Sequence, residues 1–386
     1  MSADEKATST GPLAGVTVLE LGGIGPLPLL AMLLADLGAR VIRVDPVAPS
    51  YGSIAPNLWI FRGHESLTLD LRQDEGREVL FRLVERADVL VEGYRAGVTE
   101  RLGVGPDECL ARNPKLVYGR MTGWGSSGPL ADKGGHDLNY ISITGALEAM
   151  GQKGTPPPVP LNLVGDFGGG AMMLTMGVLA ALHEREQSGR GQVVESAMSD
   201  GSLALMALFY AMRDAGHWVD ERGANQPQGG APFYRCYETS DGRYVAVGAV
   251  ENKFYADLID GLGFDPALVA TQNDRAQWPE LMPVFEAAFK TRTRAVWEAV
   301  FATRDACVTP VLSMVEAPRY PHNAERDCFV EADGRLQVAP PVRFGRTPAA
   351  VGRPSPEKGA DNERILTELG FDDADIEKLR AVGATG

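Results

Sequence analysis

The chain has 386 residues, more than one hydrophobic core usually supports, so we expect two domains. Its formal net charge of −14 provides no general attraction to nucleic acid or to an anionic membrane surface, and we expect neither as a partner. The four cysteines lie far apart in the sequence and show no metal-binding or disulfide spacing, which predicts a protein of the reducing cytoplasm.

The two ends of the sequence show no targeting signal. Met1–Lys6 is polar and mixed in charge, unlike a secretory signal, and Val382–Gly386 is unlike a peroxisomal Ser-Lys-Leu ending. We also expect no apolar stretch to approach the ~18 residues that cross a bilayer. The sequence therefore predicts a soluble cytoplasmic protein.

The first half of the chain alternates short apolar strands with helices. This order of elements is typical of a parallel sheet covered on both faces, the doubly wound α/β fold. The expected strands are Val16–Leu21, Arg40–Val44, Leu67–Leu71, Val89–Val91 and Leu116–Tyr118, and the expected helices are Pro28–Leu37 and Asp74–Arg86.

Long apolar helices follow, one from Gly165 to about Gly189 and one over 201–215. Ser240-Asp-Gly242 then joins two strands in a predicted hairpin, Tyr234–Glu238 and Tyr244–Val250. Three more helices are expected around Lys253–Leu262, Pro279–Phe289 and Ala295–Thr303, and two short ones over Asn362–Val382, the second capped by Asp372.

We therefore expect a large Rossmann-like domain over 1–200, completed by 330–386, and a small α/β domain over 225–325. The segments 201–224 and 326–340 are the expected linkers.

The glycines after the first strand do not favour a nicotinamide cofactor. Gly23-Ile-Gly25-Pro-Leu-Pro28 has proline where a dinucleotide-binding turn needs its third glycine, and prolines donate no N–H to a pyrophosphate. The order of strand, glycine turn, helix and strand, with the acidic Asp45 at its end, does resemble such a site. We expect no cofactor apart from what the substrate itself carries.

Two side chains are candidates for acid and base chemistry. His136 stands in a glycine turn that enters an expected helix, although such a histidine is more often structural. Asp166 stands at the start of a long helix, where it fits an N-cap or a site at which free N–H groups hold an anion. A helix N-terminus lowers a carboxyl pKa and burial raises it, and the sequence leaves that contest open.

Several segments resemble the family III CoA-transferase superfamily, and within it the branch of α-methylacyl-CoA racemases. The most specific are Gly135-His-Asp-Leu-Asn-Tyr-Ile-Ser-Ile143 and Asn162-Leu-Val-Gly-Asp-Phe-Gly-Gly-Gly170. Gly11–Leu21, Leu34–Asp45, Val91–Val98, Met121–Gly125, Val247–Glu251 and Leu369–Asp373 extend the resemblance over nearly the whole chain.

The resemblance implies a cofactor-independent racemase that moves the α-proton of a 2-methylacyl-CoA thioester. His136 and Asp166 match the two acid/base residues, and Glu251 matches a residue that supports the histidine. Asp137 and Tyr140 belong to the implied pocket, and backbone N–H groups at the start of the Asp166 helix would hold the enolate oxygen. The family also implies an interlocked homodimer with each active site between two subunits.

The resemblance further implies contacts to the CoA moiety. Arg72 and Arg95 fall where the family binds CoA, and Arg43, Gly135 and Ile24 complete the expected substrate contacts. One departure concerns the position after Asp45, where the family often has a basic residue followed by proline. Here Pro46 and Val47 occupy that place, and the expected substitutes are Arg43, Arg62 or Lys133.

Two other functions stay open at this point. In the transferase branch, an aspartate at the position of Asp166 attacks the thioester and passes CoA to a second carboxylate. That branch lacks a matching His-Asp pair in this role, so His136 favours the racemase. A non-catalytic acyl-CoA-binding protein is the third possibility.

Overall fold

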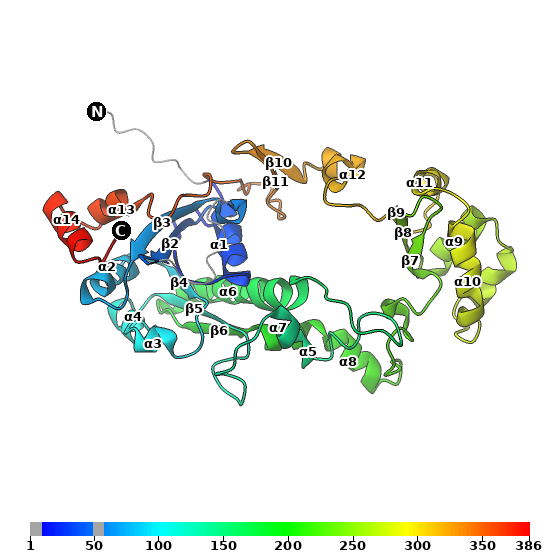
Figure 1. Cartoon of the computed structure of the whole chain (residues 1–386), viewed down its shortest axis with the longest axis horizontal. Coiled ribbons are helices and arrows are strands. Elements are labelled where there is room, and N and C mark those ends of the chain that lie inside the picture. The colour runs from blue at the N-terminus through cyan, green and yellow to red at the C-terminus, as the bar shows by residue number, and fades with distance from the viewer. Residues whose placement is uncertain (1–9, 49–57) are drawn as a thin grey trace. The chain divides into compact units, whose positions relative to one another are not determined.

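The computed structural model describes residues 10–48 and 58–386 (Figure 1). The polar segment Met1–Lys6 lies outside the described residues. The chain divides into two compact units. Unit 1 contains Met1–Thr144, Pro160–Met206 and His322–Gly386, and unit 2 contains Gly145–Val159 and Ala207–Pro321.

Unit 1 is built on a six-stranded parallel sheet with the order β3-β2-β1-β4-β5-β6. Its strands are β1 (Thr17–Leu21), β2 (Arg40–Pro46), β3 (His64–Leu69), β4 (Val89–Glu92), β5 (Val117–Thr122) and β6 (Val193–Ala197). The expected α/β fold with a parallel sheet is confirmed. In this order the chain reverses its direction across the sheet between β1 and β4, where ligands commonly bind in such folds.

The strands are apolar on both faces because helices cover both faces. One core cluster joins the sheet to α2 (Asp74–Val84), α4 (Pro106–Arg112), α13 (Asn362–Glu368) and α14 (Asp373–Ala381). The other joins it to α1 (Pro26–Asp36) and α6 (Met173–Ser188). The C-terminal helices were predicted correctly, including the cap: Asp372 accepts a hydrogen bond from the N–H of Asp375 at 2.9 Å.

Two features of unit 1 were not predicted from the sequence. Strand β6 at the edge of the sheet was not predicted, and it is only partly buried. The segment 326–340, expected as a linker, contains a hairpin of β10 (Phe329–Ala332) and β11 (Arg335–Val338). Asp333 and Gly334 both have positive φ, as the two central residues of a tight hairpin turn require.

The helix that carries Asp166 begins earlier than predicted and is π-helical at first. Its π-helical part, η2, covers Leu163–Met172 and continues directly into α6. The combined helix Leu163–Ser188 is long and apolar enough to cross a membrane by length and composition. The expectation that no apolar stretch approaches ~18 residues is therefore wrong. Inside unit 1, the buried stripe of Leu174, Val178 and Ala181 packs in the core beside the sheet.

The second apolar helix divides at the boundary between the units. It forms α7 (Met198–Leu205) in unit 1 and α8 (Ala207–Asp214) in unit 2. Unit 2 also contains the predicted hairpin, β7 (Tyr234–Glu238) and β8 (Tyr244–Gly248), to which β9 (Val308–Pro310) adds a third antiparallel strand. Its helices α9 (Asn252–Leu262), α10 (Trp278–Phe289) and α11 (Arg294–Phe301) each begin one residue before the predicted start.

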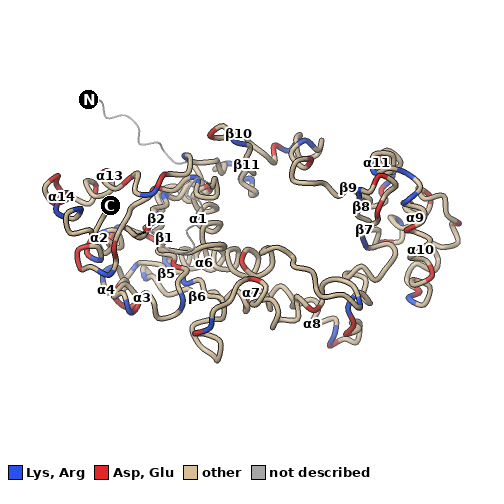
Figure 2. The backbone as a smooth tube through the Cα atoms, viewed as in Figure 1, with Lys and Arg blue, Asp and Glu red and all other residues tan. Residues whose placement is uncertain are grey.

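The remaining elements are short. Helix α3 (Val98–Arg101) follows β4, α5 (Asp137–Ser142) follows the loop after β5, and α12 (Pro321–Glu325) begins at the boundary between the units. Figure 2 shows Lys and Arg residues interspersed with Asp and Glu residues along the backbone of the described chain.

Candidate active site

His136 caps the amino end of α5. Its N–H donates to Oδ1 of Asn139 at 3.1 Å, and its carbonyl accepts the N–H of Asn139 at 2.8 Å, which fixes the start of the helix. The residue itself is exposed on unit 1. The prediction that a turn containing His136 enters a helix is confirmed.

Asp137 is buried directly behind His136 and holds the helix that carries the second candidate residue. Its Oδ1 accepts the N–H of Asp166 at 2.7 Å. Its Oδ2 is also buried and has no hydrogen-bond partner among the described residues. Gly165 allows this approach, because a Cβ at that position would lie 2.6 Å from Asp137 Oδ1. Asp137 and Asp166, which are 29 positions apart in the chain, are thus joined by one part-buried hydrogen bond.

Asp166 lies in the first turn of η2 rather than at its cap, which is Asn162. The N–H of Phe167 donates to the carbonyl of Asn162 at 3.2 Å, the wide i to i−5 spacing of a π-helix. The side chain of Asn162 donates to Asp166 Oδ2 at 3.2 Å. Segments of π-helix are frequent at functional sites because they turn side chains away from their α-helical directions.

Burial raises the pKa of Asp166 above its ordinary value. Desolvation is the largest influence and raises the pKa above its ordinary value, and the like charge of Asp137 raises it further. The hydrogen bond from Asn162 and the nearby His136 act in the opposite direction and are smaller. A raised pKa keeps more of the carboxyl group protonated, as a proton donor requires.

The first-turn N–H groups of η2 are less available than predicted. The N–H of Asp166 is used by Asp137, and that of Phe167 by the carbonyl of Asn162. The expectation that backbone donors at the start of this helix hold an enolate oxygen stays a prediction.

The turn after β1 reaches the side chain of Asp166. Gly25 has φ of +73°, and a Cβ there would lie 2.9 Å from Asp166 Oδ2. Its neighbour Ile24 is 48% exposed. This turn occupies the place where a dinucleotide-binding fold holds a pyrophosphate, and here a carboxylate lies beside it.

Tyr140 forms the other wall of the site. Its hydroxyl donates to the carbonyl of Gly135, and its ring meets Trp124 edge to face with 4.8 Å between centroids. Gly123 and Gly135 make room for the ring, since a Cβ on them would lie 2.3 and 2.7 Å from it. Burial, Asp166 and Asp137 raise the pKa of Tyr140, while Arg95 lowers it. Tyr140 therefore lies close enough to Asp166, Asp137 and Arg95 to feel their charges.

Arg95 is exposed at the edge of this cluster. A Cβ on Gly134 would lie 3.1 Å from its Nη2, so its guanidinium group is close to the turn that leads to His136. Among the described residues it makes no ion pair. Its positive charge is therefore free for an anionic ligand.

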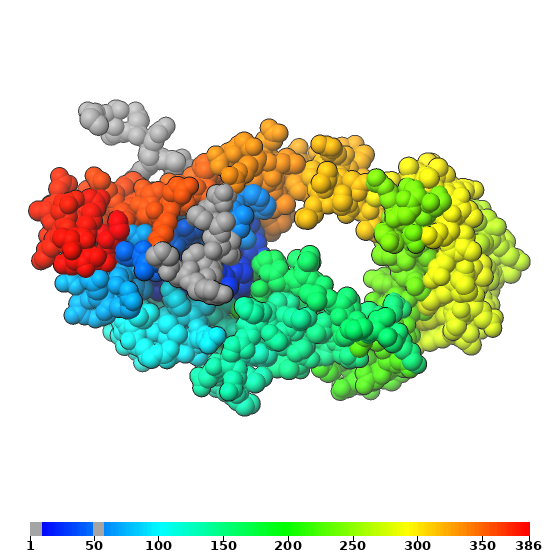
Figure 3. Space-filling view, viewed as in Figure 1, coloured from blue at the N-terminus to red at the C-terminus, as the bar shows by residue number. Residues whose placement is uncertain are grey.

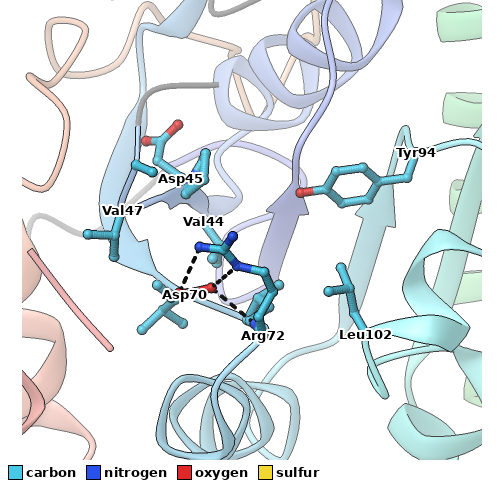
Figure 4. Close-up of a pocket in the computed structure, with 11 residues that line it drawn as sticks. Val44, Asp45, Val47, Asp70, Arg72, Tyr94 and Leu102 are labelled. Carbon is cyan, nitrogen blue, oxygen red and sulfur yellow. Dashed lines mark hydrogen bonds and ion pairs between the residues drawn. The ribbon is translucent and has the colours of Figure 1, made fainter. Parts of the chain in front are cut away.

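A cavity of about 270 Å³ opens at the carboxyl ends of β2 and β3, beside Tyr94, which follows β4 (Figure 4). Its lining is Val44, Asp45, Pro46, Val47, Ala48, Leu69, Asp70, Leu71, Arg72, Tyr94 and Leu102. A Cβ on Gly22 would lie 2.4 Å from the Tyr94 ring. The turn Gly22–Gly25 therefore touches the cavity at one end and Asp166 at the other.

Arg72 lines the cavity but is already paired. Its Nε and Nη2 donate to Asp70 at 2.8 and 3.0 Å, and these hydrogen bonds lower the pKa of Asp70 to about 2. Arg43 is buried, donates from Nε to both oxygens of Asp45, and lies 4.2 Å from the centroid of the Phe61 ring. Its Nη1 has no hydrogen-bond partner among the described residues.

Arg62 does not serve as a substitute for the missing basic residue. It is 1% exposed and forms an ion pair of 2.6 Å with buried Asp36. Removing either partner would leave a buried charge without compensation, so this pair is structural. Lys133 is exposed on the loop before His136.

Glu251 lies in unit 2, where it is exposed and caps the start of α9. It is close enough to Cys307 to raise the pKa of that thiol, although burial of the thiol has the larger effect. Unit 1 by itself brings together His136, Asp137, Tyr140 and Asp166, with Gly135 and Arg95 beside them.

Three residues of the site, Asn162, Trp124 and Gly25, were not predicted from the sequence as neighbours of Asp166 or Tyr140. Asn162 lies four residues before Asp166, a helical spacing that could have signalled a side-chain contact. Among residues 10–48 and 58–386, no group of three or more His, Cys, Asp and Glu side chains is arranged to hold a metal ion.

Comparison with known proteins gives one family. The model of CoA-transferase family III matches residues 13–362. An α-methylacyl-CoA racemase of Mus musculus is 43% identical over 371 residues, covering 96% of this chain and 96% of the relative. The α-methylacyl-CoA racemase of Homo sapiens is 40% identical with the same coverage. The crystal structure of a CAIB/BAIF family protein from Brucella suis has a TM-score of 0.79 at 25% identity, covering 93% of this chain and 99% of that chain.

Proposed function

This chain belongs to CoA-transferase family III, and on that premise we propose that it is an α-methylacyl-CoA racemase, which interconverts (2R)- and (2S)-2-methylacyl-CoA thioesters. Relatives with this name align over nearly the whole chain. The observation that carries the proposal is the pairing, in one site, of an exposed histidine with a carboxyl group whose pKa is raised. One group can accept a proton while the other donates one.

The reaction needs two proton transfers at one carbon atom. The thioester carbonyl makes the α-hydrogen acidic, so His136 removes it and the electron pair moves toward the thioester oxygen, giving an enolate. Asp166, whose raised pKa favours the protonated form, then returns a proton to the opposite face. In the reverse direction Asp166 is the base and His136 the acid. Both steps use side chains of this chain, so the proposed reaction has no cofactor.

The proposed enzyme works as a homodimer with His136 and Glu251 of one active site supplied by different subunits. Large apolar side chains are exposed in both units, as expected of surfaces that a second copy covers. The most exposed are Leu161 (70%) in unit 1, and Met314 (93%), Val315 (72%), Val159 (66%) and Leu208 (65%) in unit 2.

The competing function is CoA transfer, because the family takes its name from that reaction. Asp166 would then attack the thioester carbon, expel the CoA thiolate and form a mixed anhydride, which a second carboxylate resolves. That route uses Asp166 alone, whereas proton transfer on both faces of the α-carbon needs a second acid/base group, which the exposed His136 supplies. His136 therefore favours the racemase.

The test is to incubate (2S)-2-methylacyl-CoA with the pure protein, with and without a second carboxylate such as succinate. We expect the 2R epimer in both reactions, measured by chiral chromatography after hydrolysis, and no succinyl-CoA. His136→Ala and Asp166→Ala should each abolish epimerisation, whereas His183→Ala, an exposed histidine of α6, should retain it. Succinyl-CoA without epimer would instead establish the transferase.

A further inference from the structure

The arginines beside the cavity supply little net charge to a phosphate. Arg72 is bound by Asp70 and Arg43 by Asp45, so each pair is close to neutral. Pro46 and Val47, which also line the cavity, carry no charge. A phosphorylated ligand in this cavity needs a cation that is not already paired with a carboxylate, because the protein as a whole is acidic.

Lys358 brings such a cation to the cavity. Its Nζ donates to the carbonyl oxygen of Val47 at 3.0 Å, although the two residues are 311 positions apart in the chain. Lys358 is exposed, and no described carboxylate is within ion-pair distance of its ammonium group. An exposed ammonium group that donates one hydrogen bond to a carbonyl and forms no ion pair can still bind an anion with its two remaining N–H groups.

The backbone beside Lys358 is firmly attached to β3, next to the cavity. The N–H of Gly359 donates to Ser66 Oγ at 2.9 Å, and the N–H of Ser66 donates to Asp361 Oδ2 at 2.9 Å. Asn362 continues the attachment by accepting the N–H of Thr68 at 2.8 Å. Figure 3 shows the C-terminal residues, in orange to red, packed against the blue N-terminal part of unit 1. Lys358 is thus held in place before a ligand arrives.

We infer that Lys358 binds a phosphate group of coenzyme A at this cavity. The inference rests on the proposed function in one respect, since it requires a CoA thioester as the ligand. Ammonium–phosphate contacts are charge-assisted hydrogen bonds, and an ammonium group already fixed by the Val47 carbonyl loses little freedom on binding. Lys358 is a binding residue and takes no part in proton transfer.

The experiment measures dissociation constants by calorimetry for three ligands: CoA, dephospho-CoA and pantetheine, which has no phosphate group. Lys358→Ala should weaken CoA binding about fivefold, the range of a partly exposed charged contact, and leave pantetheine binding unchanged. Loss for both CoA and dephospho-CoA assigns Lys358 to the pyrophosphate, and loss for CoA alone assigns it to the 3′-phosphate. The control is Lys378→Ala, which removes an exposed lysine of α14 and so makes the same change of charge. It should alter none of the three dissociation constants.

Two results would overturn the inference. One is CoA affinity that Lys358→Ala leaves unchanged. The other is an equal loss for pantetheine, which would show that Lys358 only attaches the C-terminal segment to Val47. A third result would overturn the proposed racemase function and leave this inference intact. In that case the protein would bind CoA in a way that depends on Lys358 but would form no epimer.

Discussion

At the scale of single residues, the site depends on how closely Asp166 is surrounded. Gly25, Asn162 and Asp137 each approach it from a different segment. A proton donor must be held within a few tenths of an ångström to act efficiently, so small changes at these neighbours should affect catalysis more than stability.

Gly25→Ala should reduce kcat/KM by about 100-fold, because the new Cβ would force Asp166 Oδ2 to move from its position 2.9 Å away. The positive φ should also cost about 1–3 kcal/mol in the free energy of unfolding. Gly189→Ala is the control: its φ is +72°, but nothing lies within 4 Å of its Cβ. It should lose stability and keep kcat/KM. Equal activity in the two variants would contradict the role given to Gly25.

The pKa of Asp166 can be moved in both directions. Asp137→Asn removes a like charge, which lowers the pKa of Asp166, while Asn162→Ala removes a hydrogen bond that lowers it, so that pKa rises. In pH profiles of kcat/KM, the limb that reports Asp166 should shift to lower pH in the first variant and to higher pH in the second. Shifts of the same sign in both variants would show that another group titrates.

At the scale of elements, the π-helical start of the Asp166 helix is fixed by close contact with α7. A Cβ on Gly201 would lie 1.9 Å from the carbonyl oxygen of Gly169, and one on Gly169 would lie 2.8 Å from the N–H nitrogen of Ser202. The two backbones therefore touch directly, and the glycines are what allow η2 to stay in its place.

Gly201→Ala should lower the free energy of unfolding by about 3 kcal/mol and reduce activity, since η2 must shift to admit the methyl group. Thermal unfolding followed by circular dichroism, together with kcat/KM, would measure both effects. Gly345→Ala, where nothing lies within 4 Å and φ is ordinary, should change neither. An unchanged Tm in Gly201→Ala would mean that α7 and η2 are not in rigid contact.

Elements with local signals could be predicted from the sequence, and elements fixed by distant contacts could not. The hairpin of β7 and β8 was predicted because Ser240-Asp-Gly242 is a turn in its own right. The π-helix was not, because the apolar pattern from Leu163 onward is the same for an α-helix. The edge strand β6 was missed because only its last residue is buried.

At the scale of the whole molecule, the parallel sheet and its two covering layers of helices follow from the alternation of strands and helices. Which residues meet at the site cannot be deduced from that alternation. The pair of Arg62 with Asp36 and the contact of Lys358 with Val47 join segments whose meeting no local pattern signals. His136 and Asp166 were candidates from the sequence pattern, the resemblance gave them their expected roles, and the structure adds the neighbours that surround them.

The proposed sharing of the site between two subunits can be tested by complementation. In a mixed dimer of His136→Ala and Glu251→Ala subunits, one site carries both substitutions and the other carries none if His136 and Glu251 come from different chains. Activity should then recover toward half that of the natural dimer. If both residues came from one chain, the mixed dimer would have no site without a substitution and would show only the mean of its two parents.

The central claim is that the protein removes and replaces the α-proton of a CoA thioester by means of its own side chains. The most direct measurement is nuclear magnetic resonance of (2S)-2-methylacyl-CoA incubated with the pure protein in D2O without added cofactor. We predict that the α-proton signal disappears while the 2R epimer forms, and that His136→Ala and Asp166→Ala each prevent epimer formation. Full retention of the α-proton by the natural protein would contradict the account.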